Sequence, residues 1–206
     1  AITSAQEEER LRLARELHDD TIQSVIALKQ RVQLAERLVK DQKGKQSLRE
    51  LEGLAEQTVE NLRRIIRALR PIYLEDLGLV TALEMLARES KTIHVDFQRA
   101  GQEKRLDHEV ELALYRIAQE ALSNVARHSK ASQVTLKIIF SEMEFVLEVS
   151  DNGIGFDLPS SPTDFAPSGH FGLLGMKERA ELIGGRLEIQ SETDKGTRLS
   201  VRVPMI

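Results

Sequence analysis

The 206-residue chain contains no cysteine. This absence excludes disulfides, thiolate zinc sites and cysteine nucleophiles, and it suits a reducing compartment, of which the cytoplasm is the default. The chain also lacks any apolar run near the roughly 20 residues that a membrane-spanning helix needs, and no signal-peptide pattern precedes the first helical segment. We therefore expect a soluble, cytoplasmic chain that makes no membrane contact of its own.

An excess of charge of one sign is missing as well, because 29 basic and 33 acidic residues leave a formal net charge of −4. Nucleic-acid binding usually needs a net basic surface that releases phosphate counterions, so nucleic acid is not the expected ligand. What the chain does have is 41% apolar and 30% charged residues. That composition supports one large or two modest globular cores.

The N-terminal third has the spacing of long helices. From residue 3 to about residue 40 there is no Gly or Pro, and apolar residues recur every three or four positions. This pattern predicts one amphipathic helix, a polar turn at residues 41–45 and a second amphipathic helix that Pro71 ends. A lone hairpin has too little interior to bury both apolar stripes. We therefore expect a homodimer in which two hairpins form a four-helix bundle.

The remaining chain alternates short β-type runs with helical stretches, which predicts an α/β sandwich and an α+β chain overall. The expected strands are 93–98, 134–140, 145–150, 187–191 and 198–203, and the expected helices are 79–90, 107–128 and 172–183. The domains are then a hairpin at residues 1–72 and a sandwich at residues 73–206. Residues 157–170, rich in Pro, Ser and Gly, are expected to close over a ligand as a mobile loop.

His18 lies among charged residues on the first predicted helix, in the run ARELHDDTIQ. The apolar stripe of that helix is assigned to its neighbours Leu17, Thr21 and Val25. A histidine in this setting is usually only solvated, but a phosphoryl acceptor also needs an exposed, unprotonated ring nitrogen. Asp19 is placed to hold the other ring N–H. Gln23, four residues further, shares the face of Asp19, where an amide can orient a water against a phosphorylated group.

Two polar residues stand one turn apart on the helix predicted at 107–128. Glu120 and Asn124 have the spacing of two oxygen ligands, or of water-mediated contacts, around a hard cation such as Mg²⁺. A polar stripe on a helix is more often a solvated face. The pair therefore indicates a metal site only in combination with other motifs.

The run SDNGIGFD directly follows a predicted strand. Asp151 stands at the strand end, and Gly153 and Gly155 permit a tight turn and the close approach of a ligand. The same letters fit a hairpin turn, because Asn-Gly between apolar runs is a strong turn signal. Both interpretations remain open at this point.

Further glycines precede the last predicted helix and the last predicted strand. Gly169, Gly172 and Gly175 open a helix whose N-terminal amides are suited to receive phosphates, although such glycines also serve merely to shape a loop. Lys195, Gly196 and Thr197 introduce the final strand and alone would be another turn.

Taken in order, these pieces resemble the sensor histidine kinases of the nitrate-sensor and lipid-fluidity-sensor type over essentially all 206 residues. The resemblance rests on six ordered motifs: LHDDTIQ, LRPIYLEDLGLVTAL, RIAQEALSNVARHSKA, SDNGIGF, FGLLGMKERAELIGG and KGTRLSVRVP. It implies a dimerisation hairpin of the HisKA_3 type and an ATP-binding HATPase_c domain with the Bergerat fold. Because the chain opens at Ala1 in a charged helix, we expect it to be a fragment with any sensor or membrane anchor upstream.

The resemblance implies the following chemistry. His18 is the phosphoacceptor for ATP, Asp19 activates it, and Gln23 completes a D-x-x-x-Q pattern that implies phosphatase activity toward the aspartyl phosphate of a response regulator. Asn124 is a Mg²⁺ ligand with Glu120 as a second contributor. The implied partners are a second copy of the chain and the receiver domain of a response regulator. No motif position is broken, so nothing indicates a pseudokinase.

The resemblance also assigns contacts to the nucleotide. Asp151 accepts a hydrogen bond from the adenine amino group, which selects ATP over GTP. The other nucleotide-contacting positions are Arg127, His128, Gly153, Gly155, Gly172, Leu173, Gly175, Met176 and Thr197. By the same resemblance, residues 157–170 are an ATP lid. We further hypothesise a hinge near residues 71–79 on which the ATP domain swings toward His18.

Three other interpretations stay open. One is an ATPase of the same nucleotide-binding fold, of the gyrase, mismatch-repair or chaperone type, in which the hairpin has no chemical part. A second is a serine kinase of the anti-sigma type, although that class lacks a preceding hairpin with a His-Asp pair. The third is a coiled-coil interaction module whose glycine motifs are turns. A basic cluster is explained more simply as a solvated helix face or a docking surface for an acidic partner than as a nucleic-acid contact: Arg63, Arg64, Arg67 and Arg70.

Overall fold

The computed structural model describes residues 2–69, 71–90, 93–157 and 171–205. The chain divides into two compact units, Ala1–Ile72 and Tyr73–Ile206. Among the described residues, no helix has both the length and the apolar character that crossing a membrane requires. Gly169, Arg70 and the expected lid beyond Asp157 lie outside the described residues.

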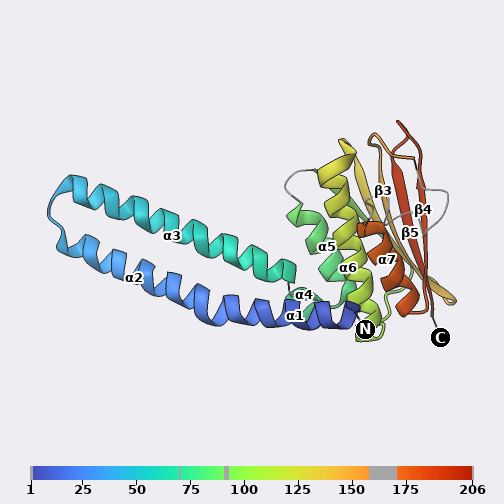
Figure 1. Ribbon diagram of the computed structural model, residues 1–206, viewed down its shortest axis with the longest axis horizontal. Helices are drawn as coiled ribbons and strands as arrows, with labels where there is room; N and C mark the ends of the chain where they lie inside the picture. Colours follow the sequence, from blue (N-terminus) through green and yellow to red (C-terminus); the bar gives the residue numbers. More distant parts are fainter. Residues whose placement is uncertain (1, 70, 91–92, 158–170, 206) are drawn as a thin grey trace. The chain divides into compact units, whose positions relative to one another are not determined.

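The first unit is an antiparallel helical hairpin (Figure 1). Its elements are α1 (Ile2–Glu16), the π-helical segment η1 (Leu17–Ile22), α2 (Gln23–Leu38) and α3 (Gln42–Leu69). Both predicted helices are therefore confirmed, but the predicted turn at 41–45 is wrong, because α3 already begins at Gln42. The cause is a helix cap: Oδ2 of Asp41 accepts a 2.7 Å hydrogen bond from the backbone N–H of Gly44.

Two kinds of contact join the arms of the hairpin. Ala14, Ile22 and Ile66 form a small buried cluster with partly buried Leu17, Ile26, Leu62 and Leu69 around it. Nearer the connection the arms are joined by polar pairs: Lys29 with Glu56, Gln33 with Glu52, and Arg49 with Glu36. The expectation that Thr21 belongs to the apolar stripe is wrong, because Thr21 is exposed and Ile22 is buried. The π-helical segment accounts for this change, since it widens the turn and shifts the helical register.

The elements that follow build the second unit. They are α4 (Ile72–Leu77), α5 (Leu79–Glu89), β1 (Val95–Ala100), α6 (His108–Asn124), η2 (Val125–Ser129), β2 (Val134–Phe140), β3 (Glu144–Asp151), α7 (Phe171–Leu182), β4 (Arg186–Ser191) and β5 (Thr197–Pro204). Every predicted strand and helix is present, with ends shifted by two residues at most. The short helix α4 is not predicted and occupies most of the expected hinge. It begins directly after Pro71, at a helix start where the missing proline N–H is tolerated.

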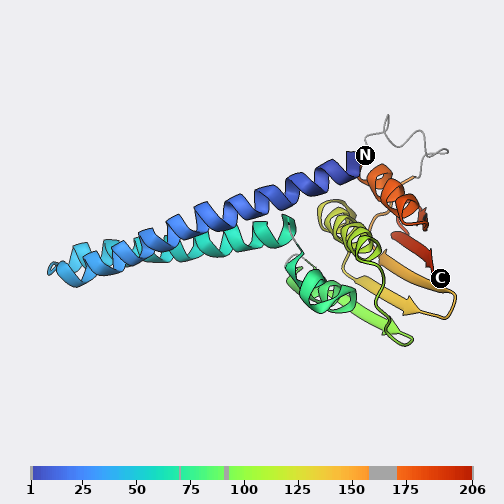
Figure 2. The same ribbon diagram turned by 90° about the horizontal axis from the view of Figure 1, so that it is seen from below.

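A five-stranded sheet in the order β1-β2-β3-β5-β4 forms one layer of this unit. Strands β1 and β2 are parallel, and the other neighbours are antiparallel. Alternate strand residues are buried, as Val134, Leu136, Ile138 and Phe140 of β2 illustrate. Helices α5, α6 and α7 form the second layer against that face (Figure 2). The other face carries exposed ion pairs, including Arg198 with Glu148 and Arg202 with Glu144.

Candidate functional site

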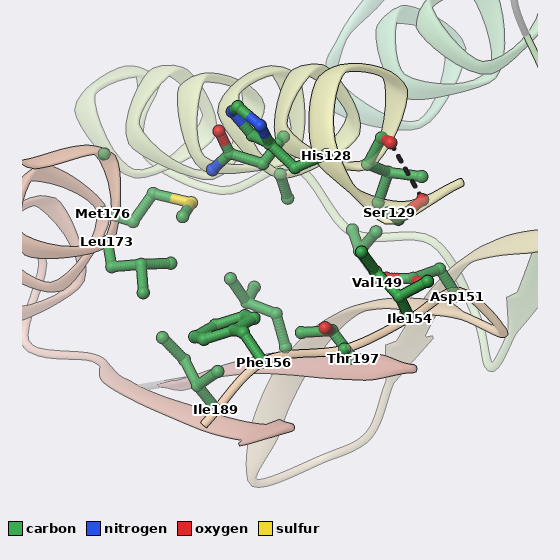
Figure 3. Close-up of a pocket in the computed structure, with 16 residues that line it drawn as sticks. His128, Ser129, Val149, Asp151, Ile154, Phe156, Leu173, Met176, Ile189 and Thr197 are labelled. Atoms are coloured by element: carbon green, nitrogen blue, oxygen red, sulfur yellow. Dashed lines mark hydrogen bonds between the residues drawn. The ribbon is translucent and has the colours of Figure 1, made fainter. Parts of the chain in front are cut away.

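A cavity of about 450 Å³ lies between α6, α7 and the ends of β3, β4 and β5 (Figure 3). Its volume falls in the range of pockets that hold small organic ligands. Apolar side chains make up most of the lining: Ala121, Val125, Val149, Ile154, Phe156, Leu173, Met176, Ile189 and Leu199. The polar lining residues are Asn124, His128, Ser129, Asp151 and Thr197. An apolar slot with polar groups at its margin suits a flat heterocycle.

Asp151 ends β3 at the margin of this cavity and is half-buried. Burial raises the pKa of Asp151 above its ordinary value, and hydrogen bonds from the backbone N–H groups of Gly153 and Thr197 lower it in part. Its Oδ1 atom accepts the hydrogen bond from Gly153 N at 2.8 Å. A carboxylate in a largely apolar pocket is stabilised by a ligand that donates a hydrogen bond to it.

The glycines after Asp151 allow two backbone segments to touch, and only Gly155 lines the cavity. A Cβ atom on Gly153 would lie 2.2 Å from the carbonyl oxygen of Ser129, which accepts a hydrogen bond from Ile154 N. Gly155 has φ +58, and a Cβ there would lie 2.1 Å from Glu192 O. Both glycines therefore make room for neighbouring backbone, and Gly155 also lines the cavity.

The alternative interpretation of Asn152-Gly153 as a hairpin turn is wrong. After β3 the chain continues toward α7, and the side chain of Asn152 instead fastens the neighbouring loop. Its Oδ1 atom accepts hydrogen bonds from the backbone N–H groups of Ser132, at 3.0 Å, and Gln133, at 2.9 Å. The asparagine therefore links the loop after η2 to the end of β3.

The end of α6 supplies the other polar groups. Asn124 and His128 line the cavity, whereas Glu120 and Arg127 do not. Arg127 is exposed and donates a hydrogen bond to the hydroxyl of Ser123. The chain passes through the π-helical segment η2 here. Such widened turns are frequent at functional sites, and here η2 includes His128, which lines the cavity.

Glu120 and Asn124 converge on the first turn of α7. A Cβ on Gly172 would lie 2.6 Å from Glu120 Oε1 and 3.5 Å from Asn124 Nδ2. Within the described ranges, no group of three or more His, Asp or Glu side chains is arranged to hold a metal ion by itself. This donor set fits Mg²⁺, which usually takes one or two protein ligands and completes its shell with phosphate oxygens and water.

Helix α7 contributes Gly172, Leu173 and Met176 to the lining, whereas Gly175 does not line the cavity. The lining residues that the sequence patterns did not identify are mainly apolar. Phe156 lies at the floor of the cavity near Ile189 and Thr197 (Figure 3). The alternation of apolar and polar residues in the sequences of β4 and β5 was the available signal for Ile189 and Leu199, since the face that packs under the helices also floors the cavity.

In the first unit, His18 forms a contact with the residue next to it. Its Nδ1 atom lies 3.0 Å from Oδ1 of Asp19, and the side chains are 59% and 73% exposed. Both residues belong to η1, and Gln23, the first residue of α2, is exposed as well. A carboxylate on Nδ1 favours the tautomer whose proton sits there, which leaves Nε2 as an exposed lone pair.

Two protein families match the chain. The family described as "Histidine kinase" matches residues 9–74, which cover most of the hairpin, including its His18-Asp19 pair. The family described as "Histidine kinase-, DNA gyrase B-, and HSP90-like ATPase" matches residues 109–206, which contain the cavity. The chain belongs to the sensor histidine kinases. The match over the hairpin decides against the gyrase-type ATPase, the anti-sigma serine kinase and the coiled-coil interpretations.

Relatives of this sensor histidine kinase core cover nearly all of it. The signal transduction histidine-protein kinase/phosphatase DegS of Brevibacillus brevis is 37% identical over 99% of the chain and 53% of DegS. The oxygen sensor histidine kinase NreB of Staphylococcus carnosus is 35% identical over 98% of the chain and 58% of NreB. Sensor histidine kinase LiaS of Bacillus subtilis is 39% identical over 96% and 54%. The chain thus spans little more than half of these relatives.

A solved structure has the same fold. The histidine kinase domain of the Erythrobacter litoralis EL346 blue-light activated histidine kinase has a TM-score of 0.52 at 15% identity, covering 88% of this chain and 94% of that one. This similarity, with the family match at residues 109–206, confirms the Bergerat fold of the second unit. The family match alone makes that unit an ATP-binding domain.

Proposed function

We propose that this kinase core transfers the γ-phosphoryl group of ATP to His18 and then passes it to an aspartate of a response-regulator receiver domain. The observation that carries the proposal is the 3.0 Å contact between His18 Nδ1 and Asp19 Oδ1 on an exposed helix surface. It leaves Nε2 available to a reactant, in a chain whose second unit belongs to an ATP-binding family. The cytoplasm, where ATP is abundant and thiols stay reduced, is the proposed compartment.

The transfer step follows from that geometry. Nε2 of His18 forms a bond to the γ-phosphorus while the bond from phosphorus to the bridging oxygen breaks, and ADP leaves with that electron pair. Asp19 keeps the ring proton at Nδ1 and stabilises the positive charge that the ring gains. Mg²⁺, held through Asn124 with Glu120 beside it, would neutralise charge on the phosphates when bound. Residues 71–79 are the proposed hinge.

The nucleotide is proposed to enter the cavity with its base against Asp151. Adenine carries an amino group that donates a hydrogen bond to the carboxylate, whereas guanine presents a carbonyl oxygen at the same ring position and would repel it. His128 also lines the cavity (Figure 3), and the Asn124 side chain lies next to Gly172 of α7. The first turn of α7, including Gly172, is the proposed phosphate-binding end.

A second activity is proposed for the same hairpin. Asp19 and Gln23 are both exposed, one and five residues after His18 in the sequence, and a docked receiver domain is proposed to bring its aspartyl phosphate to this surface. The amide of Gln23 is suited to hold a water in line with that phosphorus, and attack by the water releases inorganic phosphate. The core is thus proposed to dephosphorylate its partner as well as to phosphorylate it.

The test of this function is the chemical nature of the label that the chain acquires from γ-labelled ATP with Mg²⁺. Phosphohistidine is labile in acid and stable in base, whereas phosphoserine behaves in the opposite way. We expect acid-labile, base-stable label that a receiver domain removes from the chain. Steady hydrolysis of ATP with no label on the protein would contradict the proposal.

A homodimer is proposed because the hairpin leaves much of its apolar surface uncovered. Leu28, Leu34, Leu38, Leu51, Leu54 and Ile65 are each at least 48% exposed. These residues occur on both arms, and the buried cluster of the hairpin is small. A second hairpin would cover this surface and complete a four-helix bundle.

Replacing Leu54 by Glu is expected to weaken this association at least about a hundredfold, because each dimer loses two buried leucines and would bury two charges. Light scattering coupled to size-exclusion chromatography measures the mass of both forms. Gln46→Glu on the same helix adds the same charge at an exposed polar position and should stay dimeric. A dimeric Leu54→Glu variant would contradict the bundle.

A further inference from the structure

Ser191, the last residue of β4, is not among the lining residues, but its hydroxyl contacts two residues that are. Ser191 Oγ accepts a hydrogen bond from the backbone N–H of Phe156 at 2.9 Å. It also lies 3.0 Å from Oγ1 of Thr197 and 3.2 Å from the carbonyl oxygen of Gly196. A single side chain therefore joins the loop after β3 to the start of β5, and both segments border the cavity.

Other contacts also join the loop after β3 to the loop between β4 and β5. Asp194 N donates a 2.7 Å hydrogen bond to Ile154 O, and Thr193 Oγ1 donates one to Asp157 Oδ1 at 3.1 Å. Ser191 differs from these because its hydroxyl contacts the hydroxyl of Thr197, a polar side chain that lines the cavity. Removing that hydroxyl leaves the backbone contacts in place. The removal changes the contacts to Phe156 and Thr197, the part of the cavity wall that a ligand would meet.

The hydrogen atoms of the two hydroxyls determine what Thr197 offers to a ligand. Ser191 Oγ has one hydrogen and two lone pairs, and the N–H of Phe156 takes one lone pair. If Ser191 donates to Gly196 O, the hydroxyl of Thr197 must donate to Ser191, and only its lone pairs face the cavity. If Ser191 donates to Thr197, the hydrogen of Thr197 is free to point into the cavity.

This second arrangement matches one edge of adenine. Thr197 and Asp151 are paired residues on neighbouring strands, so an acceptor and a donor stand side by side. Adenine has an amino donor next to a ring-nitrogen acceptor. Guanine has a carbonyl acceptor next to a ring N–H donor, which is the reverse order. The hydroxyl pair is therefore able to recognise the base as well as hold the loops.

We infer that Ser191 is a positioning residue for the base. It orders the Thr197 hydroxyl as a donor toward a ring nitrogen, and it holds the backbone N–H of Phe156, which lines the cavity. The inference rests on the proposed place of adenine at Asp151. Ser191 acts on the base and not on the phosphates. Removing the Ser191 hydroxyl should therefore weaken the binding of adenosine and of ATP by the same factor.

The test compares Ser191→Ala with Ser200→Ala by calorimetry with adenosine and with ATP. Ser200 is a matched control, because its buried hydroxyl on neighbouring β5 has no hydrogen-bond partner among the described residues. Ser191→Ala is expected to weaken the binding of both ligands about tenfold and to reduce the preference for ATP over GTP. Ser200→Ala should bind as the unchanged chain does, and Ser191→Thr should restore affinity.

Labelling kinetics separate positioning from a merely structural role. Ser191→Ala should raise the KM for ATP and leave the rate at saturating ATP unchanged. Ser191→Cys nearly keeps the side-chain volume, but its thiol forms only weak hydrogen bonds. It should show the same loss of affinity, and it replaces the alanine variant if that variant does not fold. In a Thr197→Val background, Ser191→Ala should weaken adenosine less than in the original chain, since the hydroxyl it orders is gone.

Two results would overturn the inference, and they differ. If Ser191→Ala or Ser191→Cys binds with wild-type affinity while Asp151→Asn loses binding, the role of Ser191 is contradicted and the adenine site is supported. Wild-type adenosine binding in Asp151→Asn would remove the adenine site itself, and the role of Ser191 with it.

Discussion

Replacing His18 by Gln is expected to reduce the label taken from ATP by at least about a thousandfold, because the amide has no nucleophilic nitrogen to accept the phosphoryl group. His18 belongs to the first unit, whereas the cavity with Asp151 belongs to the second. The dissociation constant for ATP should therefore not change. Filter-bound label and calorimetry on the same preparation measure the two quantities.

His108→Gln is the matched control for that loss. His108 is an exposed histidine at the start of α6 and does not line the cavity. It should retain the labelling of the original chain. Acid-labile label that persisted in His18→Gln would place the acceptor elsewhere, and loss of label in both variants would show a general defect.

Asp151→Asn is expected to weaken ATP binding about a hundredfold. It removes a charge-assisted hydrogen bond and puts an NH₂ donor where an acceptor is needed. Oδ1 of the carboxylate already accepts from Gly153 N, and the N–H of Thr197 also donates to the group. The amide of Asn would set its NH₂ against one of these N–H groups or against the adenine amino group. Displacement of a fluorescent ATP analogue measures the change.

Asp96→Asn is the control for this substitution, since Asp96 is exposed on β1 and does not line the cavity. It should bind ATP as the original chain does. A dissociation constant unchanged in Asp151→Asn would contradict the proposed place of the base.

The pH dependence gives a second check on Asp151. Burial raises the pKa of Asp151 above the ordinary value of 3.8, so its carboxylate is protonated at a higher pH than an exposed aspartate. Adenosine donates to the ionised form, and its affinity should therefore be constant near neutral pH and fall as pH drops through that raised pKa. Asp151→Asn should lack this step. Adenosine is the suitable probe because it has no phosphate that titrates.

Elements with a strong local pattern were predictable from the sequence. Strands β2, β3 and β5 follow runs rich in β-branched and aromatic residues, and their predicted ends differ from the observed ones by one residue at most. Helix α7 was marked by its glycines. The long helices of the hairpin were predictable because apolar residues recur every three or four positions. Many of these apolar residues are nevertheless exposed in the single hairpin.

The features that escaped prediction depend on contacts distant in the sequence or on departures from the α-helical period. The π-helical segment η1 buries Ile22 where an ideal helix would bury Thr21. Ser191 is an ordinary polar residue of an edge strand until folding brings Phe156, 35 residues away, to its hydroxyl. The room that Gly153 makes is for the backbone of Ser129, which no local motif reveals.

The central claim is that the γ-phosphoryl group of ATP ends on His18. The most direct test is to locate the phosphoryl group by mass spectrometry at neutral pH, after incubation with ATP and Mg²⁺ and without acid treatment. We predict one modified peptide, containing His18, with fragments that place the added mass on that residue. A phosphoryl group on any other residue, or ADP formation with no modified peptide, would contradict the account.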